Sequence, residues 1–230
     1  METIASRYQG LMARIAAAAA RAGRDPRAVQ LVAVSKTVDP ARVREAYAAG
    51  ARTFGENRAQ ELGPKAVALA DLAIEWHFLG HLQSNKARAV MGVSALIHSV
   101  DRLDLAQRIS AGATPEQPQR ILVQVNTSGE ASKSGVAPPA LAALLDGIAP
   151  LPGLVVEGLM TIGPLTDDAG AIRAAFRLLR QARDRERAAR PAMPLAHLSM
   201  GMSGDFEIAI EEGATLLRIG TALFGARDGA

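Results

Sequence analysis

Cysteine is absent from this chain of 230 residues, so disulfide bonds, thiolate catalysis and zinc sites with cysteine ligands are excluded. The chain also lacks a long uncharged apolar run, the pattern typical of a transmembrane helix. Its N-terminus carries Glu2, Arg7 and Arg14 in a periodic stretch and has no basic start, apolar middle or cleavage site of a signal peptide. We therefore expect a soluble cytoplasmic protein.

Aromatic residues are scarce, at 3% of the chain, and the net charge of +3 is small. Arginines are densest between Arg173 and Arg190, where they alternate with Asp184 and Glu186. With so few aromatic side chains, this run offers no platform on which bases would stack. The pattern indicates the solvated face of a helix, and we expect no nucleic-acid partner.

Lysine is rare as well, because most of the basic residues are arginine. An exposed lysine is usually replaced by arginine at little cost, whereas arginine cannot form an imine with a carbonyl compound. Each lysine of this chain is therefore a candidate for chemistry; they are Lys36, Lys65, Lys86 and Lys133.

Short apolar runs alternate with helical patterns along the whole chain. The runs typical of buried parallel strands are Leu31–Ser35, Thr53–Gly55, Trp76–Gly80, Ala95–Val100, Ile121–Asn126, Val155–Met160, Leu195–Met200 and Leu216–Gly220. The helical patterns are Pro40–Ala49, Arg58–Leu72, Leu103–Ala111, Pro139–Ala149 and Ala169–Ala189, preceded by an extra helix at about 3–22. This order predicts an α/β protein, a (β/α)8 TIM-type barrel forming one domain over residues 1–230.

The alternative fold is an open, doubly wound parallel sheet. Such sheets bind dinucleotides through a Gly-x-Gly-x-x-Gly turn after the first strand, and no such turn follows Ser35. The closed barrel is therefore the favoured prediction.

Polar residues collect at the carboxyl ends of the predicted strands, where barrels of this type place their active sites. Lys36 follows the apolar run Leu31–Val34 directly. Partial burial at such a strand end favours a neutral amine, the nucleophile that attacks a carbonyl group. The alternative is a lysine whose stem packs on the barrel while its ammonium reaches solvent.

The loops after the last two predicted strands have the composition of a phosphate site. Gly201–Gly204 can turn backbone N–H groups toward an anion before a predicted helix at 205–212, and Gly220 and Thr221 add an unhindered N–H and a hydroxyl. The alternative is that Ser203 or Asp205 caps the helix. A lysine with a phosphate site indicates a phosphorylated carbonyl ligand, either pyridoxal 5′-phosphate (PLP) or a phosphosugar of a Schiff-base aldolase.

His77 and His81 are four residues apart, a spacing that would pair them on a helix. Here Gly80 interrupts a strand-like run, and no third ligand is apparent. Because a metal site needs three or four ligands, we expect no metal here and assign both histidines to the barrel mouth or the core.

Motifs along nearly the whole chain resemble those of the pyridoxal phosphate homeostasis protein family. The segments that carry the resemblance are Val-Ala-Val-Ser-Lys ending at Lys36, Phe-Gly-Glu-Asn-Arg at 54–58, Trp-His-Phe-Leu-Gly-His-Leu-Gln-Ser-Asn-Lys at 76–86, Gln-Val-Asn-Thr-Ser at 124–128, Lys-Ser-Gly at 133–135, Gly-Leu-Met at 158–160, Leu-Ser-Met-Gly-Met-Ser-Gly-Asp-Phe at 198–206 and Arg-Ile-Gly-Thr-Ala-Leu-Phe-Gly at 218–225.

The resemblance implies a barrel like the N-terminal domain of alanine racemase, with PLP held as a Schiff base. It implies that Lys36 forms the imine, that Arg218 faces the pyridine nitrogen and that Asn57 and Met200 line the ring. It implies that the phosphate is held by Ser203, Gly204, Gly220 and Thr221. No catalytic residue is implied.

The function implied is intracellular PLP homeostasis and the balance of amino-acid and keto-acid pools, with apo-enzymes that need PLP as partners and a monomeric chain. The alternative is a PLP-dependent enzyme such as an amino-acid racemase. Such racemases add a second domain whose tyrosine serves as an acid, whereas this sequence ends at Ala230 and its two tyrosines, Tyr8 and Tyr47, lie off the predicted rim. Arg218 also favours the carrier, since arginine at the ring nitrogen makes PLP a weaker electron sink.

Overall fold

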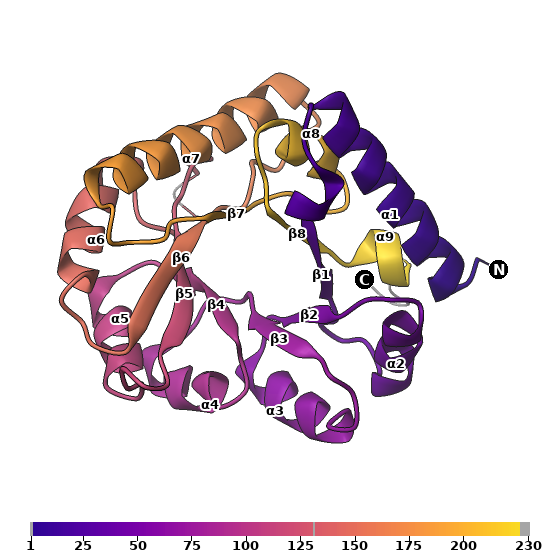
Figure 1. The fold of residues 1–230 in the computed structure, drawn as a ribbon, viewed down its shortest axis with the longest axis horizontal. Coiled ribbons are helices and arrows are strands. Elements are labelled where there is room, and N and C mark those ends of the chain that lie inside the picture. The colour runs from indigo at the N-terminus through magenta and orange to yellow at the C-terminus, as the bar shows by residue number, and fades with distance from the viewer. Residues whose placement is uncertain (1, 131, 226–230) are drawn as a thin grey trace.

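The computed structural model describes residues 2–130 and 132–225 of the chain. Parallel strands close into a barrel in sequence order, as Figure 1 shows, and this confirms the predicted fold class. The strands are β1 (Gln30–Val34), β2 (Thr53–Glu56), β3 (Glu75–Phe78), β4 (Leu96–Val100), β5 (Gln119–Gln124), β6 (Leu154–Met160), β7 (His197–Ser199) and β8 (Leu216–Ile219). Each lies within a few residues of its predicted position.

Helices form an outer ring around the barrel (Figure 1). They are α1 (Ile4–Arg21), α2 (Pro40–Ala48), α3 (Ala59–Ala68), α4 (Ala87–Met91), α5 (Leu103–Ser110), α6 (Leu141–Ile148), α7 (Ala169–Ala189), α8 (Phe206–Glu211) and α9 (Thr221–Phe224), with short 3-10 helices at 26–28, 84–86 and 138–140. The additional N-terminal helix is confirmed, and it packs beside α8 and α9. The short helices α4 and α9 were not predicted.

Side-chain caps explain where several helices begin. Thr3 accepts a hydrogen bond from the N–H of Ser6 at the start of α1, and Asp168 accepts one from Gly170 at the start of α7. Asp39 caps α2, whose first residue, Pro40, needs no hydrogen-bond acceptor. None of the helices described is both long and apolar enough to cross a bilayer.

Two apolar clusters hold the fold together. The larger one fills the space between the strands and the surrounding helices and includes Phe54, Phe176 and Phe206. The smaller one consists of inward-facing strand residues, namely Val32, Leu96, Leu122, Met160 and Leu216. Polar strand residues are buried as well, among them His77, His98, Ser199 and Arg218.

Candidate functional site

A cavity of about 420 Å³ opens at the carboxyl ends of the strands. It brings together all but one of the residues that the sequence singled out for ligand binding, which are Lys36, Asn57, Ser203, Gly204, Arg218, Gly220 and Thr221. The rest of its lining is Val34, Leu79, Gly80, His81, Ile162 and Met202. The predicted lysine and the two predicted anion-binding loops therefore face one space.

Met200 is the exception. Its side chain is fully buried in the larger core cluster and is not part of this lining, whereas Met202 is. The reason is local: β7 ends at Ser199, and Gly201 then turns the chain with φ +93°. A Cβ on Gly201 would lie 2.6 Å from the Cβ of Ala209, so only glycine fits this turn.

Lys36 is partly buried just beyond the end of β1. The next residue, Thr37, has φ +60°, a left-handed conformation that is uncommon outside glycine. Its backbone N–H donates to Oε2 of Glu61 at 3.0 Å, which ties this turn to α3. Strain of this kind persists where the surroundings impose it, and it often accompanies a functional residue.

A buried ion pair between Glu56 and Lys65 contacts Ser35, the residue before Lys36. Oε1 of Glu56 accepts hydrogen bonds from Oγ of Ser35 at 2.7 Å and from Nζ of Lys65 at 2.6 Å. Lys65 also donates to the backbone carbonyl of Ser35 at 2.7 Å. Because Lys65 is committed to these contacts, it is not a candidate for imine formation. The scarcity of lysine in the sequence marked Lys65 as a candidate for chemistry. Only the packing of α3 on β2 reveals that its partner is Glu56.

Asn57 has an unused hydrogen-bonding atom in the cavity wall. Its Oδ1 atom is buried and has no partner among the described residues. Gly80 lies against its backbone, since a Cβ at position 80 would come within 2.0 Å of the carbonyl oxygen of Asn57. A ligand that donates a proton to Oδ1 would satisfy the amide.

The two loops expected to hold an anion are joined to each other. Oγ of Ser203 accepts a hydrogen bond from the N–H of Ala222 at 3.2 Å, and does not cap α8. Asp205 instead accepts from the N–H of Met202 at 2.5 Å, within the preceding turn. A Cβ on Gly204 meets no atom within 4 Å, so the loop leaves open space beside it.

Arg218 carries the deepest charge of the site. It is 6% exposed, and its guanidinium donates to Oγ of Ser199 at 2.8 Å and to the carbonyl of Thr161 at 2.7 Å. Burial lowers the pKa of Arg218 to about 10, against an opposing effect of the Asp205 carboxylate. The guanidinium therefore remains a cation at neutral pH.

The two histidines that the sequence singled out, His77 and His81, lie in different surroundings. His77 is buried inside the barrel and contacts His98, a residue that the sequence analysis did not single out. His81 is exposed, lines the cavity and lies 3.4 Å from Oγ of Ser134 through its Nδ1 atom. No group of three possible metal ligands occurs among residues 2–130 and 132–225.

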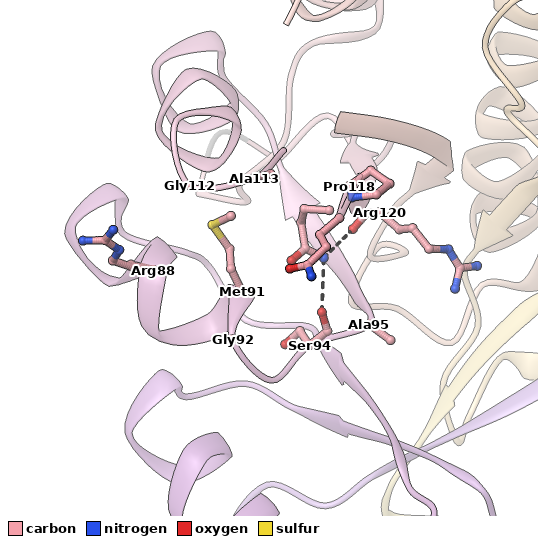
Figure 2. Close-up of a pocket in the computed structure, with 11 residues that line it drawn as sticks. Arg88, Met91, Gly92, Ser94, Ala95, Gly112, Ala113, Pro118 and Arg120 are labelled. Carbon is pink, nitrogen blue, oxygen red and sulfur yellow. Dashed lines mark hydrogen bonds between the residues drawn. The ribbon is translucent and has the colours of Figure 1, made fainter. Parts of the chain in front are cut away.

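A larger cavity of about 550 Å³ lies at the start of β4 and β5, away from this site. Figure 2 shows that Met91 points into it, while the guanidinium groups of Arg88 and Arg120 extend away from it. Gln119 belongs to its lining and donates to the carbonyls of Ser94 and Arg120. Its lining contains no lysine, so it offers no amine for an imine, unlike the cavity at the carboxyl ends of the strands.

Known proteins match this chain over nearly its whole length. The family model for the alanine racemase N-terminal domain matches residues 8–228. A protein of Pseudomonas aeruginosa named pyridoxal phosphate homeostasis protein is 52% identical over 229 residues, which cover 99% of this chain and 97% of that protein. The chain belongs to the pyridoxal phosphate homeostasis protein family.

Solved structures agree with the family. PipY of Synechococcus elongatus, in a structure with PLP bound, is 39% identical with a TM-score of 0.84, over 97% of this chain and 100% of that one. Alanine racemase of Corynebacterium glutamicum has a TM-score of 0.71 at 18% identity, over 96% of this chain and 62% of that one. The latter likeness concerns the fold alone, and it is the fold expected for this family.

Proposed function

We propose that this chain binds PLP in the cavity at the carboxyl ends of the strands, as a Schiff base on Lys36, and acts in PLP homeostasis. The observation that carries the proposal is the lining of one cavity by a lysine, a buried arginine and two joined glycine-containing loops. The PLP bound to PipY, a member of the same fold at 39% identity, supports it.

The residues present fit the cofactor. PLP supplies an aldehyde for an imine, a ring with a hydroxyl and a nitrogen, and a phosphate. The partnerless Oδ1 of Asn57 is an acceptor for a hydroxyl proton, and the open space at Gly204 leaves room for a phosphate against the joined loops. Ser203, Gly220 and Thr221 would hold that phosphate, and Arg218 would face the ring nitrogen.

Arg218 favours a carrier over an enzyme. A guanidinium with a pKa of about 10 has no proton-accepting atom at neutral pH, so it leaves the ring nitrogen without a proton. A racemase also needs an acid or base on each face of the substrate. Besides Lys36 and Arg218, the described lining offers only His81 as a titratable group. We accordingly propose no efficient turnover by this chain.

The wider role follows from the carrier assignment. We propose that a monomeric, single-domain cytoplasmic chain holds PLP reversibly, gives it to apo-enzymes and thereby keeps amino-acid and keto-acid pools in balance. A Schiff base suits this role because imine exchange with another amine releases the cofactor without leaving a modified lysine behind.

The binding proposal is tested by absorbance titration of the protein with PLP. The wild type and Lys86→Arg should develop the near-ultraviolet to violet band of an imine, and Lys36→Ala should not. An equal band in Lys36→Ala would overturn the assignment of Lys36.

The carrier proposal needs a separate measurement on the PLP-loaded protein. Single L-amino acids are incubated with it in deuterated water, and α-hydrogen exchange and racemisation are followed. We expect exchange far slower than about 1 s⁻¹, the lower end of typical enzyme turnover. Exchange at that rate, abolished by Lys36→Ala, would favour the racemase alternative, whereas transfer of PLP to an apo-enzyme without exchange supports the carrier.

A further inference from the structure

A continuous series of hydrogen bonds runs through the barrel interior from Glu75 to Arg218, and we refer to it as the Glu75–Arg218 chain. Nη1 of Arg218 donates to Oγ of Ser199 at 2.8 Å, and Ser199 Oγ lies 2.9 Å from Nδ1 of His98. Nε2 of His98 lies 3.0 Å from Nδ1 of His77, and Nε2 of His77 lies 3.3 Å from Oε1 of Glu75. The chain spans β3, β4, β7 and β8.

With both imidazoles neutral, the two ends fix the direction of every hydrogen bond. Arginine only donates, and an ionised carboxylate only accepts. Ser199 therefore accepts from Arg218 and donates its own proton to Nδ1 of His98, which leaves the His98 proton on Nε2. His77 accepts that proton at Nδ1 and donates from Nε2 to Glu75. An additional proton on Nδ1 of His98 would reverse its bond with Ser199, so that Oγ accepts from both His98 and Arg218.

The surroundings of His98 disfavour a positive charge. It is fully buried, and burial is the main cause that lowers its pKa well below 6.5. The titratable groups that face it are His77 from β3, Arg218 from β8 and His197 from β7, and each lowers the pKa further. Among the described residues no carboxylate is hydrogen-bonded to His98, and Glu75 contacts His77, Thr53 and Arg120 instead.

The other end of the chain reaches solvent. Glu75 is the first residue of β3 and is 39% exposed, as is Arg120 of β5, which lies 3.6 Å away. Glu157 of β6 contacts both Arg120 at 2.9 Å and His197 at 3.7 Å. In Figure 2 the Arg120 side chain extends away from the neighbouring cavity. At the far end, Asp205 is the carboxylate that acts on Arg218. The Glu75 end of the chain is therefore open to solvent, and the Arg218 end faces the cavity.

We propose that Ser199, His98 and His77 are positioning residues that hold the Arg218 guanidinium in the cavity, and that a proton taken up by His98 reverses its bond to Ser199 and loosens Arg218. A proton added to Nδ1 of His98 makes this ring compete with Arg218 as a donor to Ser199 Oγ and sets a second positive charge facing Arg218. The inference rests on the proposed function, in which Arg218 faces the ring nitrogen, and it adds a dependence of ligand binding on pH.

Two substitutions at one position separate positioning from packing. His98→Asn keeps an acceptor oxygen near the place of Nδ1 but cannot be protonated near neutral pH. His98→Leu fills similar space without an acceptor. The ligand used is pyridoxine 5′-phosphate, which has the ring and the phosphate but no aldehyde, so imine formation with Lys36 does not enter the measurement.

Binding of pyridoxine 5′-phosphate is measured by titration from pH 8 to about pH 5. At pH 8 we expect His98→Leu to bind on the order of 10-fold more weakly than His98→Asn, the effect of one misplaced hydrogen bond to a charged group. Below pH 6.5, the wild type should lose affinity more steeply than His98→Asn. Equal affinities of the two variants at pH 8, or parallel pH profiles of wild type and His98→Asn, would overturn the proposal.

A second readout needs no ligand. Nitrogen NMR of protein labelled in histidine should show His77 and His98 neutral at pH 8, each with its proton on Nε2, and Ser199→Ala should release this preference at His98. A proton on Nδ1 of either ring in the wild type contradicts the chain. If no variant binds pyridoxine 5′-phosphate, the proposed function fails, and the tautomers still decide whether the chain exists.

Discussion

Nζ of Lys65 lies 2.6 Å from Oε1 of Glu56, and both side chains are buried. The same ammonium donates to the carbonyl of Ser35, the residue before Lys36, so one ion pair ties α3 to the ends of β1 and β2. Buried charges of this kind are costly when one partner is removed, because the other is left in a low dielectric without compensation.

Lys65→Met should therefore destabilise the protein by about 3–5 kcal/mol, measured as the free energy of unfolding in urea. Lys133→Met is the matched control, because its partner Glu130 is 41% exposed and such pairs contribute about 0–1 kcal/mol. Similar losses for the two variants would mean that the Glu56–Lys65 pair does not hold the strand ends.

The phosphate loops give a second prediction. The double variant Ser203→Ala, Thr221→Ala should weaken PLP binding much more than pyridoxal binding, since each lost hydrogen bond to a charged phosphate costs about 1.5–3 kcal/mol. The measurement is a pair of dissociation constants for each protein. An equal loss for both ligands would show that the phosphate binds elsewhere.

A third prediction concerns the contact between Gly80 and Asn57. Gly80→Ala should displace the Asn57 backbone, because the added Cβ would come within 2.0 Å of its carbonyl oxygen, and PLP affinity should fall. Gly63→Ala in α3 meets nothing within 4 Å and should stabilise the helix by up to about 1 kcal/mol while leaving affinity unchanged. Unchanged PLP affinity in Gly80→Ala would contradict a role for Asn57 in the site.

The buried histidines should make the free energy of unfolding depend on pH. Burial lowers the pKa of His98 well below 6.5. Between the folded-state pKa and about pH 6.5, the unfolded chain therefore binds a proton at His98 that the folded protein does not bind. The stabilisation is complete above about pH 6.5 and is lost as pH falls toward the folded-state pKa, by up to about 1.4 kcal/mol per pH unit. Burial also lowers the pKa of His197, against an opposing effect of Glu157, and this adds to the same decline.

The check is a series of urea unfolding curves from pH 8 to about pH 5. His98→Asn should have a shallower decline than the wild type, because asparagine does not titrate in this range. Carboxylates with lowered pKa values, such as Glu212, lose their stabilising effect only as pH falls below their usual pKa of 4.5, so they do not add to the decline between pH 8 and about pH 5. A wild-type stability independent of pH over this range would contradict the buried neutral His98.

The barrel was predictable because most residues of its strands are buried, so that the strands appear as short apolar runs between helical patterns. Lys36 was predictable for the same reason, since it directly follows such a run. His98 was not, because it lies within an apolar run and only the strand register turns it inward toward His77. Met200 was predicted to line the ring, but the turn at Gly201 brings Met202 to the cavity in its place.

Borohydride reduction of the PLP-loaded protein, followed by peptide mapping in a mass spectrometer, tests the central claim most directly. Reduction fixes the imine as a stable amine on whichever lysine formed it, and the chain offers only Lys36, Lys65, Lys86 and Lys133. The account predicts the pyridoxyl phosphate mass on the peptide that contains Lys36. Label on any of the other lysines, with Lys36 unmodified, would contradict it.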